Sequence, residues 1–164
     1  MRLTYESAAV RVPATTANMG PGFDSFGMAF RHYDEVEVRP VTGPTRVEIE
    51  GVGAGTVPTD DNNLVVRALR TGLEAVGAPQ AGFQMRCVNR IPHGGGMGSS
   101  ASAVVAGLML ARGLISDPEA LDDDLVFALA TDFEGHPDNV APAVFGGTKL
   151  PRSEERRVGK ECRS

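Results

Sequence analysis

Four stretches of the chain alternate apolar and polar residues with the period of a β-strand. The alternation is clearest where valine or isoleucine fills every second position, as at Val36 and Val38 and again at Val47 and Ile49. A period of two puts one set of side chains on the face of a sheet that packs against a core. The Thr-Gly-Pro turn at 42–44 predicts a hairpin between the second and third strands. The predicted strands cover residues 9–13, 32–40, 45–50 and 83–90, and a further strand is expected over residues 143–149.

Three other stretches carry apolar residues at the spacing of an α-helix. Residues 63–76 have this spacing, with capping side chains at 60–62 and Gly77 as a stop signal. Residues 99–115 are so apolar that this helix is expected to lie in the core. A third helix is predicted from the Asp-Pro pair that follows it to about Phe133. This order of elements predicts an α+β fold with a mixed sheet packed against helices, not the regular alternation of a doubly wound sheet.

Composition and charge restrict the class of protein. The 164 residues suffice for one domain, and 41% hydrophobic with 23% charged residues is ordinary for a globular chain. A net charge of -5 argues against nucleic acid or an acidic membrane surface as the main partner. The two cysteines imply no disulfide framework, and the first residues do not form a signal peptide. The most apolar stretch, residues 101–111, is too short to cross a bilayer, so we expect a cytoplasmic protein.

The last residues of the chain, 151–164, differ from the rest. They hold five basic and three acidic residues and a single large hydrophobe, Val158. Such a composition predicts a disordered tail that is not native to the protein. We therefore expect one domain over residues 1–150.

The segment IPHGGGMGSSAS at 91–102 is the most informative in the chain. It places four glycines between a predicted strand and the apolar helix, which opens with Ser99 and Ser100. Glycine lets successive N–H groups turn toward one point, and a helix start adds unpaired donors and partial positive charge. We expect an anion cradle suited to phosphate, with one serine capping the helix and the other free for a ligand. A flexible loop before a buried helix is the alternative interpretation.

Other glycine motifs do not fit this segment. No lysine precedes the two serines, and Ser99 stands where G-x-G-x-x-G requires its third glycine. The esterase motif G-x-S-x-G lacks its last glycine, because Ser102 occupies that position. A hydrolase built on Ser99 or Ser100 is an alternative, but no histidine is obviously placed as its base.

A second segment, PATTANMGPGFDSFG at 13–27, combines a Gly-Pro-Gly turn with short polar side chains. Asn18 and Asp24 on such a rigid loop could bind an ammonium or hydroxyl group of a small substrate. An ordinary connecting loop is the alternative.

A third segment, EGHPDNVAPAVFGG at 134–147, follows the predicted end of a helix. Glu134 could hold a divalent cation, which prefers carboxylate oxygen when phosphates share its shell. Asp138 and Asn139 could cap the next segment or contact a ligand. His136 is one of only three scattered histidines, so a histidine metal site is not expected.

In order and content these three motifs resemble those of the GHMP kinases. PHGGGMGSSAS is similar to the family's P-x-x-x-G-L-G-S-S-A-A phosphate loop, with Met97 in place of leucine and Ser102 in place of alanine. PATTANMGPGFDSFGMAF and EGHPDNVAPAVFGG are similar to the homoserine kinase branch in particular. The resemblance covers about residues 8–148. It implies the family's N-terminal, ATP-binding domain, which has the ribosomal protein S5 domain 2-like fold.

The resemblance implies a site for ATP and Mg²⁺. Asn63 would lie near the adenine, and Mg²⁺ would be held by Glu134 with Ser100 or Ser99. Phosphoryl transfer needs alignment and charge neutralisation more than covalent help from the protein, which agrees with this division of roles. The ATP phosphates would be wrapped by Pro92, His93, Gly94, Gly95, Gly96, Met97, Gly98, Ser99, Ser100, Ala101 and Ser102.

The implied reaction transfers the γ-phosphate of ATP to the side-chain hydroxyl of L-homoserine, a step in threonine biosynthesis. Asn18, Asp24 and Asn139 would contact the substrate, with Asp24 facing its ammonium group. Asp24 is the one candidate for a catalytic base, and substrate binding is the role we favour for it.

Homoserine kinases are roughly twice as long as this chain and close the site with a C-terminal domain, which the 164 residues are expected to lack. An open site admits water and weakens contacts to the phosphates. We therefore expect little or no kinase activity from the chain itself. Two alternatives stay open: a nucleotide-binding module without catalysis, and another small-molecule kinase of the family such as mevalonate kinase. The resemblance also leaves open whether the full-length protein is a homodimer.

Overall fold

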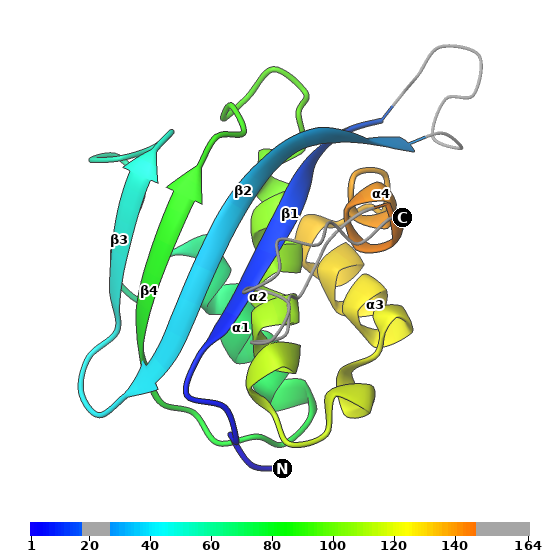
Figure 1. Cartoon of the computed structure of the whole chain (residues 1–164). Coiled ribbons are helices and arrows are strands. Elements are labelled where there is room, and N and C mark those ends of the chain that lie inside the picture. Colours follow the sequence, from blue (N-terminus) through cyan, green and yellow to red (C-terminus); the bar gives the residue numbers. More distant parts are fainter. Residues whose placement is uncertain (18–26, 147–164) are drawn as a thin grey trace, which may run out of the picture.

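The framework of the structure, a computed structural model that describes residues 1–17 and 27–146, is a four-stranded sheet. Its strands are β1 (Ala8–Ala17), β2 (Gly27–Val41), β3 (Arg46–Gly51) and β4 (Gly82–Asn89). They lie side by side in the order β1, β2, β4, β3 (Figure 1). β1 pairs antiparallel with β2 and β2 with β4, whereas β3 runs parallel to β4. The sheet is therefore mixed, as predicted.

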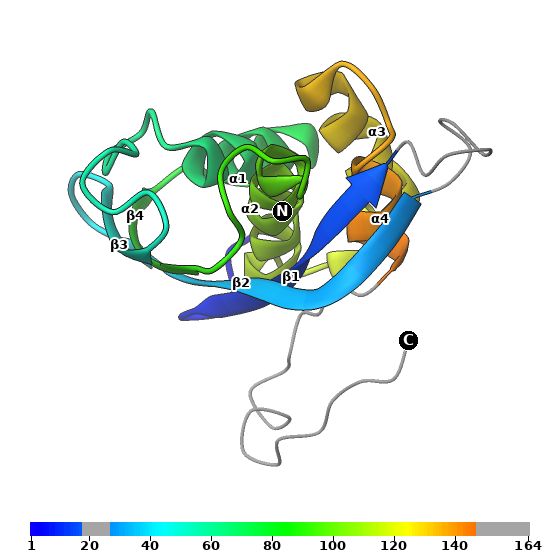
Figure 2. The same cartoon turned by 90° about the horizontal axis from the view of Figure 1, so that it is seen from above.

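Two helices, α1 (Leu64–Ala75) and α2 (Ser99–Leu114), cover one face of this sheet (Figures 1 and 2). Eleven of the sixteen residues of α2 are buried, which confirms the prediction of a core helix. The strands supply the opposite wall of the core, with Phe83, Met85 and Cys87 buried in alternation with exposed Gln84 and Arg86. Among the described residues, no helix has the length and apolar character needed to cross a membrane.

The predicted hairpin between β2 and β3 is wrong, because β4 lies between them. Val41 pairs with Gly82 on one edge of β4, and Arg46 pairs with Gln84 on its other edge. Thr45 helps to fix this arrangement, since its Oγ1 accepts a hydrogen bond from the Phe83 N–H at 3.2 Å. The turn at 42–44 is a local signal, and it carries no information about β4, which lies some forty residues further along the chain.

The predicted third helix is divided in two. A 3₁₀ turn, η2 (Pro118–Leu121), precedes α3 (Asp123–Glu134). Asp122 separates them and caps α3, accepting a hydrogen bond from the Leu125 N–H at 2.9 Å. The capping aspartate is a better helix start than the Asp-Pro pair on which the prediction rested.

The strand predicted at 143–149 is also wrong, because residues up to Phe145 belong to a short helix, α4 (Val140–Phe145). Val140, Ala143 and Val144 are buried at helical spacing. Pro142 is tolerated because it lies in the first turn, where a backbone N–H has no partner within the helix. Residues 147–149, and the predicted tail at 151–164, lie outside the described residues.

Close packing of α1 on α2 depends on Gly107. A Cβ built there would lie 2.3 Å from the Val65 carbonyl oxygen and 2.6 Å from Ala68 Cβ. Gly107→Ala is therefore expected to lower the free energy of unfolding by about 2 kcal/mol or more, although alanine itself favours helices. Urea denaturation followed by circular dichroism measures this change.

Gly72→Ala is the matched comparison, because its Cβ would approach only side-chain atoms, the nearest being Ala111 Cβ at 2.8 Å. We expect a loss no more than about half as large, since the nearest approach is 2.8 Å at Gly72 and 2.3 Å at Gly107, so the overlap to be relieved is smaller. Equal losses for the two variants would contradict this account of the helix interface.

Candidate active site

The glycine-rich segment joins the end of β4 to the start of α2, at the end of the sheet where β1 also finishes (Figure 1). Gly94, Gly95 and Gly96 have φ values of 82°, 73° and 74°, in the left-handed region that favours glycine. A Cβ at any of the three would meet nothing within 4 Å. The backbone of this loop is thus open to a ligand on the side where a Cβ would stand.

Helix α2 begins directly after this loop, with Gly98 as its N-cap at a φ of 70°. No side chain caps the helix, so the prediction that Ser99 or Ser100 does so is wrong. The reason is the position of the cap, which lies one residue earlier than the serines. Positive φ at that position favours glycine, which leaves both hydroxyls for other partners.

The Ser100 side chain is hydrogen-bonded to a residue of α3. Its Oγ donates a hydrogen bond of 2.7 Å to Oε1 of Glu134, although the two residues are 34 positions apart. Gly135 ends α3 in a left-handed conformation and turns the chain away, so the carboxylate remains beside the start of α2. A hydroxyl and a carboxylate are hard oxygen ligands of the kind that Mg²⁺ prefers. This pairing also argues against a hydrolase built on Ser100, since its hydroxyl is bonded to a carboxylate and not to a histidine.

Among the described residues, no three histidine, cysteine, aspartate or glutamate side chains come together as a metal site. The two oxygen groups of Ser100 and Glu134 could complete a Mg²⁺ shell only with phosphate and water oxygens. That is the usual arrangement for Mg²⁺ bound with a nucleotide, so the donor set fits the ion.

Thr15 connects the three motifs. The predicted connecting loop begins later than expected, because β1 continues through this residue to Ala17. The Thr15 N–H donates to the Met97 carbonyl at 2.9 Å, and its Oγ1 donates to Oδ1 of Asn139 at 3.1 Å. A Cβ on Gly98 would lie only 2.1 Å from this Oγ1. The fully buried Thr15 therefore holds the end of the glycine loop against the third motif.

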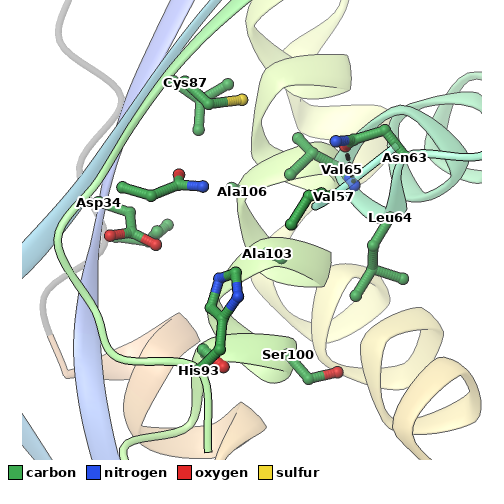
Figure 3. Close-up of a pocket in the computed structure, with 14 residues that line it drawn as sticks. Asp34, Val57, Asn63, Leu64, Val65, Cys87, His93, Ser100, Ala103 and Ala106 are labelled. Carbon is green, nitrogen blue, oxygen red and sulfur yellow. Dashed lines mark hydrogen bonds between the residues drawn. The ribbon is translucent and has the colours of Figure 1, made fainter. Parts of the chain in front are cut away.

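A cavity of about 230 Å³ lies between the sheet and the two long helices, next to the glycine loop (Figure 3). Its polar groups are Asp34, Asn63, Asn89, His93, Ser99 and Ser100. The remaining wall is mostly apolar and suits a flat ring: it consists of Val12, Val36, Val57, Leu64, Val65, Cys87, Ala103 and Ala106.

Asn63 lines this cavity, but its amide also has structural partners. Its Oδ1 accepts from the Val65 N–H at 2.9 Å, and its Nδ2 donates to the Pro58 carbonyl at 2.9 Å. Asn63 is thus the N-cap of α1, which the sequence analysis expected at 60–62. A nucleotide could still contact its second Oδ1 lone pair.

The remaining predicted nucleotide residues fall into two groups. Pro92 and His93 are exposed at the start of the loop, whereas Ala101 and Ser102 are buried in α2. The Ser102 Oγ donates to the Pro13 carbonyl at 2.7 Å, so this hydroxyl ties α2 to β1. The predicted substrate residues Asn18 and Asp24 lie outside the described residues. Asn139 is the predicted substrate residue that the structure places beside the loop.

Burial changes the acidity of two groups in the cavity wall. It raises the pKa of the Asp34 carboxyl, against the opposing effect of hydrogen bonds from the Ile91 and Arg90 N–H groups. Burial, with a smaller contribution from Asp34, raises the pKa of the Cys87 thiol to about 12. Cys87 is therefore a neutral, weakly reactive part of the wall at physiological pH.

No site role was predicted from the sequence for Thr15, Asp34 or Asn89. Thr15 belongs to the first motif, so its polar side chain among small residues was a usable signal. Asp34 had a weaker one: a carboxylate at a position that the alternation of β2 places on the buried face, with Val36 and Val38. Asn89 carried no comparable sequence signal.

Residues 63–147 match the family described as GHMP kinases N terminal domain, and the chain belongs to this family. Its curated relatives include proteins named homoserine kinase. The one from Leifsonia xyli subsp. xyli is 54% identical over 150 residues, which is 90% of this chain and 46% of that protein. The one from Streptomyces coelicolor is 49% identical over 149 residues, 89% of this chain and 48% of that protein.

Solved structures agree with this assignment. The homoserine kinase from Cytophaga hutchinsonii is 31% identical, with a TM-score of 0.74 over 93% of this chain and 50% of that one. The mevalonate kinase of Methanococcus jannaschii, at 14% identity and a TM-score of 0.63 over 88% of this chain and 55% of that one, shares the fold. The chain therefore has the predicted GHMP N-terminal fold, and it spans about half the length of the curated relatives it matches.

Proposed function

We propose that this chain forms the ATP-binding half of a kinase that phosphorylates the side-chain hydroxyl of L-homoserine. The observation that carries the proposal is the convergence of three distant motifs on one point. Thr15 of β1, Met97 and Gly98 of the loop, and Asn139 of α4's N-cap lie in direct contact there. Beside it, Ser100 on the first turn of α2 is hydrogen-bonded to Glu134 at the end of α3.

This geometry supports a role for each residue. The N–H groups of the glycine loop and of the start of α2 would bind the phosphates of ATP, and the apolar cavity would receive the adenosine. Ser100 and Glu134 would hold Mg²⁺, which when bound neutralises charge on the phosphates. Asn139 is near enough to the loop to orient an acceptor molecule.

The choice of L-homoserine is supported by the names of the relatives and by the first and third motifs. We assign Asn18 and Asp24 to the substrate, with Asp24 as the partner of its ammonium group and not as a base. Mevalonate kinases share the fold at about 14% identity, which does not bear on the substrate. The reaction would take place in the cytoplasm.

A chimera tests this proposal. Residues 1–146 would be joined to the remaining half of the Leifsonia xyli relative, and ADP release would be measured with L-homoserine, mevalonate and galactose. We expect turnover with L-homoserine alone, and little or none from the 164-residue chain by itself. Turnover with another acceptor would replace the substrate assignment. Tight ATP binding without turnover of any acceptor would favour the nucleotide-binding module.

A further inference from the structure

The pairing between β2 and β4 ends shortly before the chain enters the glycine loop. The pairing of β2 with β4 ends at Glu35 and Val88. The pairing of β2 with β1 continues past this point, through Asp34 opposite Val12. The backbone of Arg90 therefore loses the regular strand partner that the rest of β4 has.

Side chains of β2 replace that partner. Oδ1 of Asp34 accepts hydrogen bonds from the N–H groups of both Arg90, at 2.6 Å, and Ile91, at 2.8 Å. Nε2 of His32 donates to the Arg90 carbonyl at 2.7 Å. Asp34 is 7% exposed and lines the cavity beside the loop, so its two bonds are largely shielded from water, whereas the His32 bond is exposed.

We propose that Asp34, assisted by His32, is a positioning residue that fixes the entrance of the phosphate loop, which we define as its first residues, Arg90 and Ile91. The inference rests on the proposed binding of ATP to this loop. A Cβ at any of the glycines at 94–96 would meet nothing within 4 Å, so no packed neighbour fixes these residues from that side. Glycine has little conformational preference of its own, so the shape of the loop depends on its two ends. At the far end of the loop, Thr15 is hydrogen-bonded to the backbone of Met97. At the entrance, Asp34 is hydrogen-bonded to the backbone of Arg90 and Ile91.

The geometry indicates which property of Asp34 matters. Both backbone bonds converge on one oxygen, so an asparagine at this position can accept them through its amide oxygen. Alanine can accept neither bond and leaves two N–H groups without their partner. The role therefore requires an accepting oxygen at this place more than it requires a charge.

The test compares Asp34→Ala and Asp34→Asn with the wild-type chain, using amide hydrogen exchange and calorimetric titration of Mg·ATP. For Asp34→Ala we expect exchange of the Ile91 amide and the Kd for Mg·ATP each to rise about tenfold or more. For Asp34→Asn we expect both to stay within about threefold of wild type. Unchanged Ile91 exchange in a folded Asp34→Ala chain, or equal losses in both variants, would overturn the proposal.

Thr45→Ala is the matched control. Thr45 is also 7% exposed, and its oxygen accepts from the Phe83 N–H at the opposite end of β4. Its loss is expected to speed exchange at Phe83 and to leave the Kd for Mg·ATP unchanged. A Kd as weak as that of Asp34→Ala would show that only general stability had been lost.

Two further results separate this inference from the proposed function. If the wild-type chain does not bind Mg·ATP, the proposed function of this chain fails, while Ile91 exchange in Asp34→Ala still decides whether the loop entrance is held as described. If Asp34→Ala does not fold, His32→Ala takes its place, because His32 is exposed. We then expect a Kd about fivefold weaker, outside the range allowed for Asp34→Asn, and a Kd within that range would overturn the proposal.

Discussion

Gly98→Ala is expected to abolish measurable nucleotide binding, with a Kd for Mg·ATP at least about 100-fold weaker than wild type. The new Cβ would lie 2.1 Å from Oγ1 of Thr15 and 3.3 Å from Oδ1 of Asn139. Thr15 is fully buried and cannot rotate away without breaking its bond to Asn139. The loop must therefore move, and the first N–H groups of α2 move with it. Calorimetric titration of the purified variant measures the effect.

Gly96→Ala controls for backbone strain alone. Its φ of 74° is close to the 70° of Gly98, but its Cβ would meet nothing within 4 Å. The left-handed conformation costs alanine about 1 kcal/mol, so we expect binding to weaken only about fivefold. If the two variants bound Mg·ATP equally well, the contact of Gly98 with Thr15 would not be what fixes the loop.

The fold was predictable where the signal is local. The period of two found the buried alternation of Phe83, Met85 and Cys87, and the apolar run found α2. The insertion of β4 between β2 and β3 was not predictable in this way, because it is decided by pairing between distant strands. The misassigned α4 has a similar cause: six residues are too few to distinguish a buried strand from a buried helix.

The candidate site was predictable mainly through the order of its motifs. The glycines, the helix start behind them and the two serines together predicted an anion-binding loop. The assignment of Ser100 and Glu134 to one metal site came from the family resemblance. Nothing local links two residues that lie 34 positions apart. Asp34 and Thr15 act through backbone groups of other segments, so their roles appear only once the segments are packed together.

Glu134→Gln is expected to weaken the dependence of ATP binding on Mg²⁺. The carboxylate is half-buried, bonded to Ser100 at 2.7 Å, and supplies the negative charge of the proposed cation site. Replacing it with a neutral amide of the same size should raise the Mg²⁺ concentration needed for half-maximal ATP binding by about 10- to 100-fold. ATP titrations at a series of fixed Mg²⁺ concentrations measure this shift. Asp132→Asn is the control, since it removes the same charge from an exposed position of α3.

The same substitution should not harm the fold, and this distinguishes a ligand from a structural residue. Glu134 is the last residue of α3, where the negative end of the helix dipole disfavours a carboxylate. Neutralising it is therefore expected to stabilise the chain slightly, by about 0.3–1 kcal/mol, while Mg²⁺ binding weakens. A carboxylate kept at an unfavourable position is consistent with selection for binding. A Glu134→Gln chain that unfolds more easily, or that needs no more Mg²⁺ than Asp132→Asn, would remove Glu134 from the metal site.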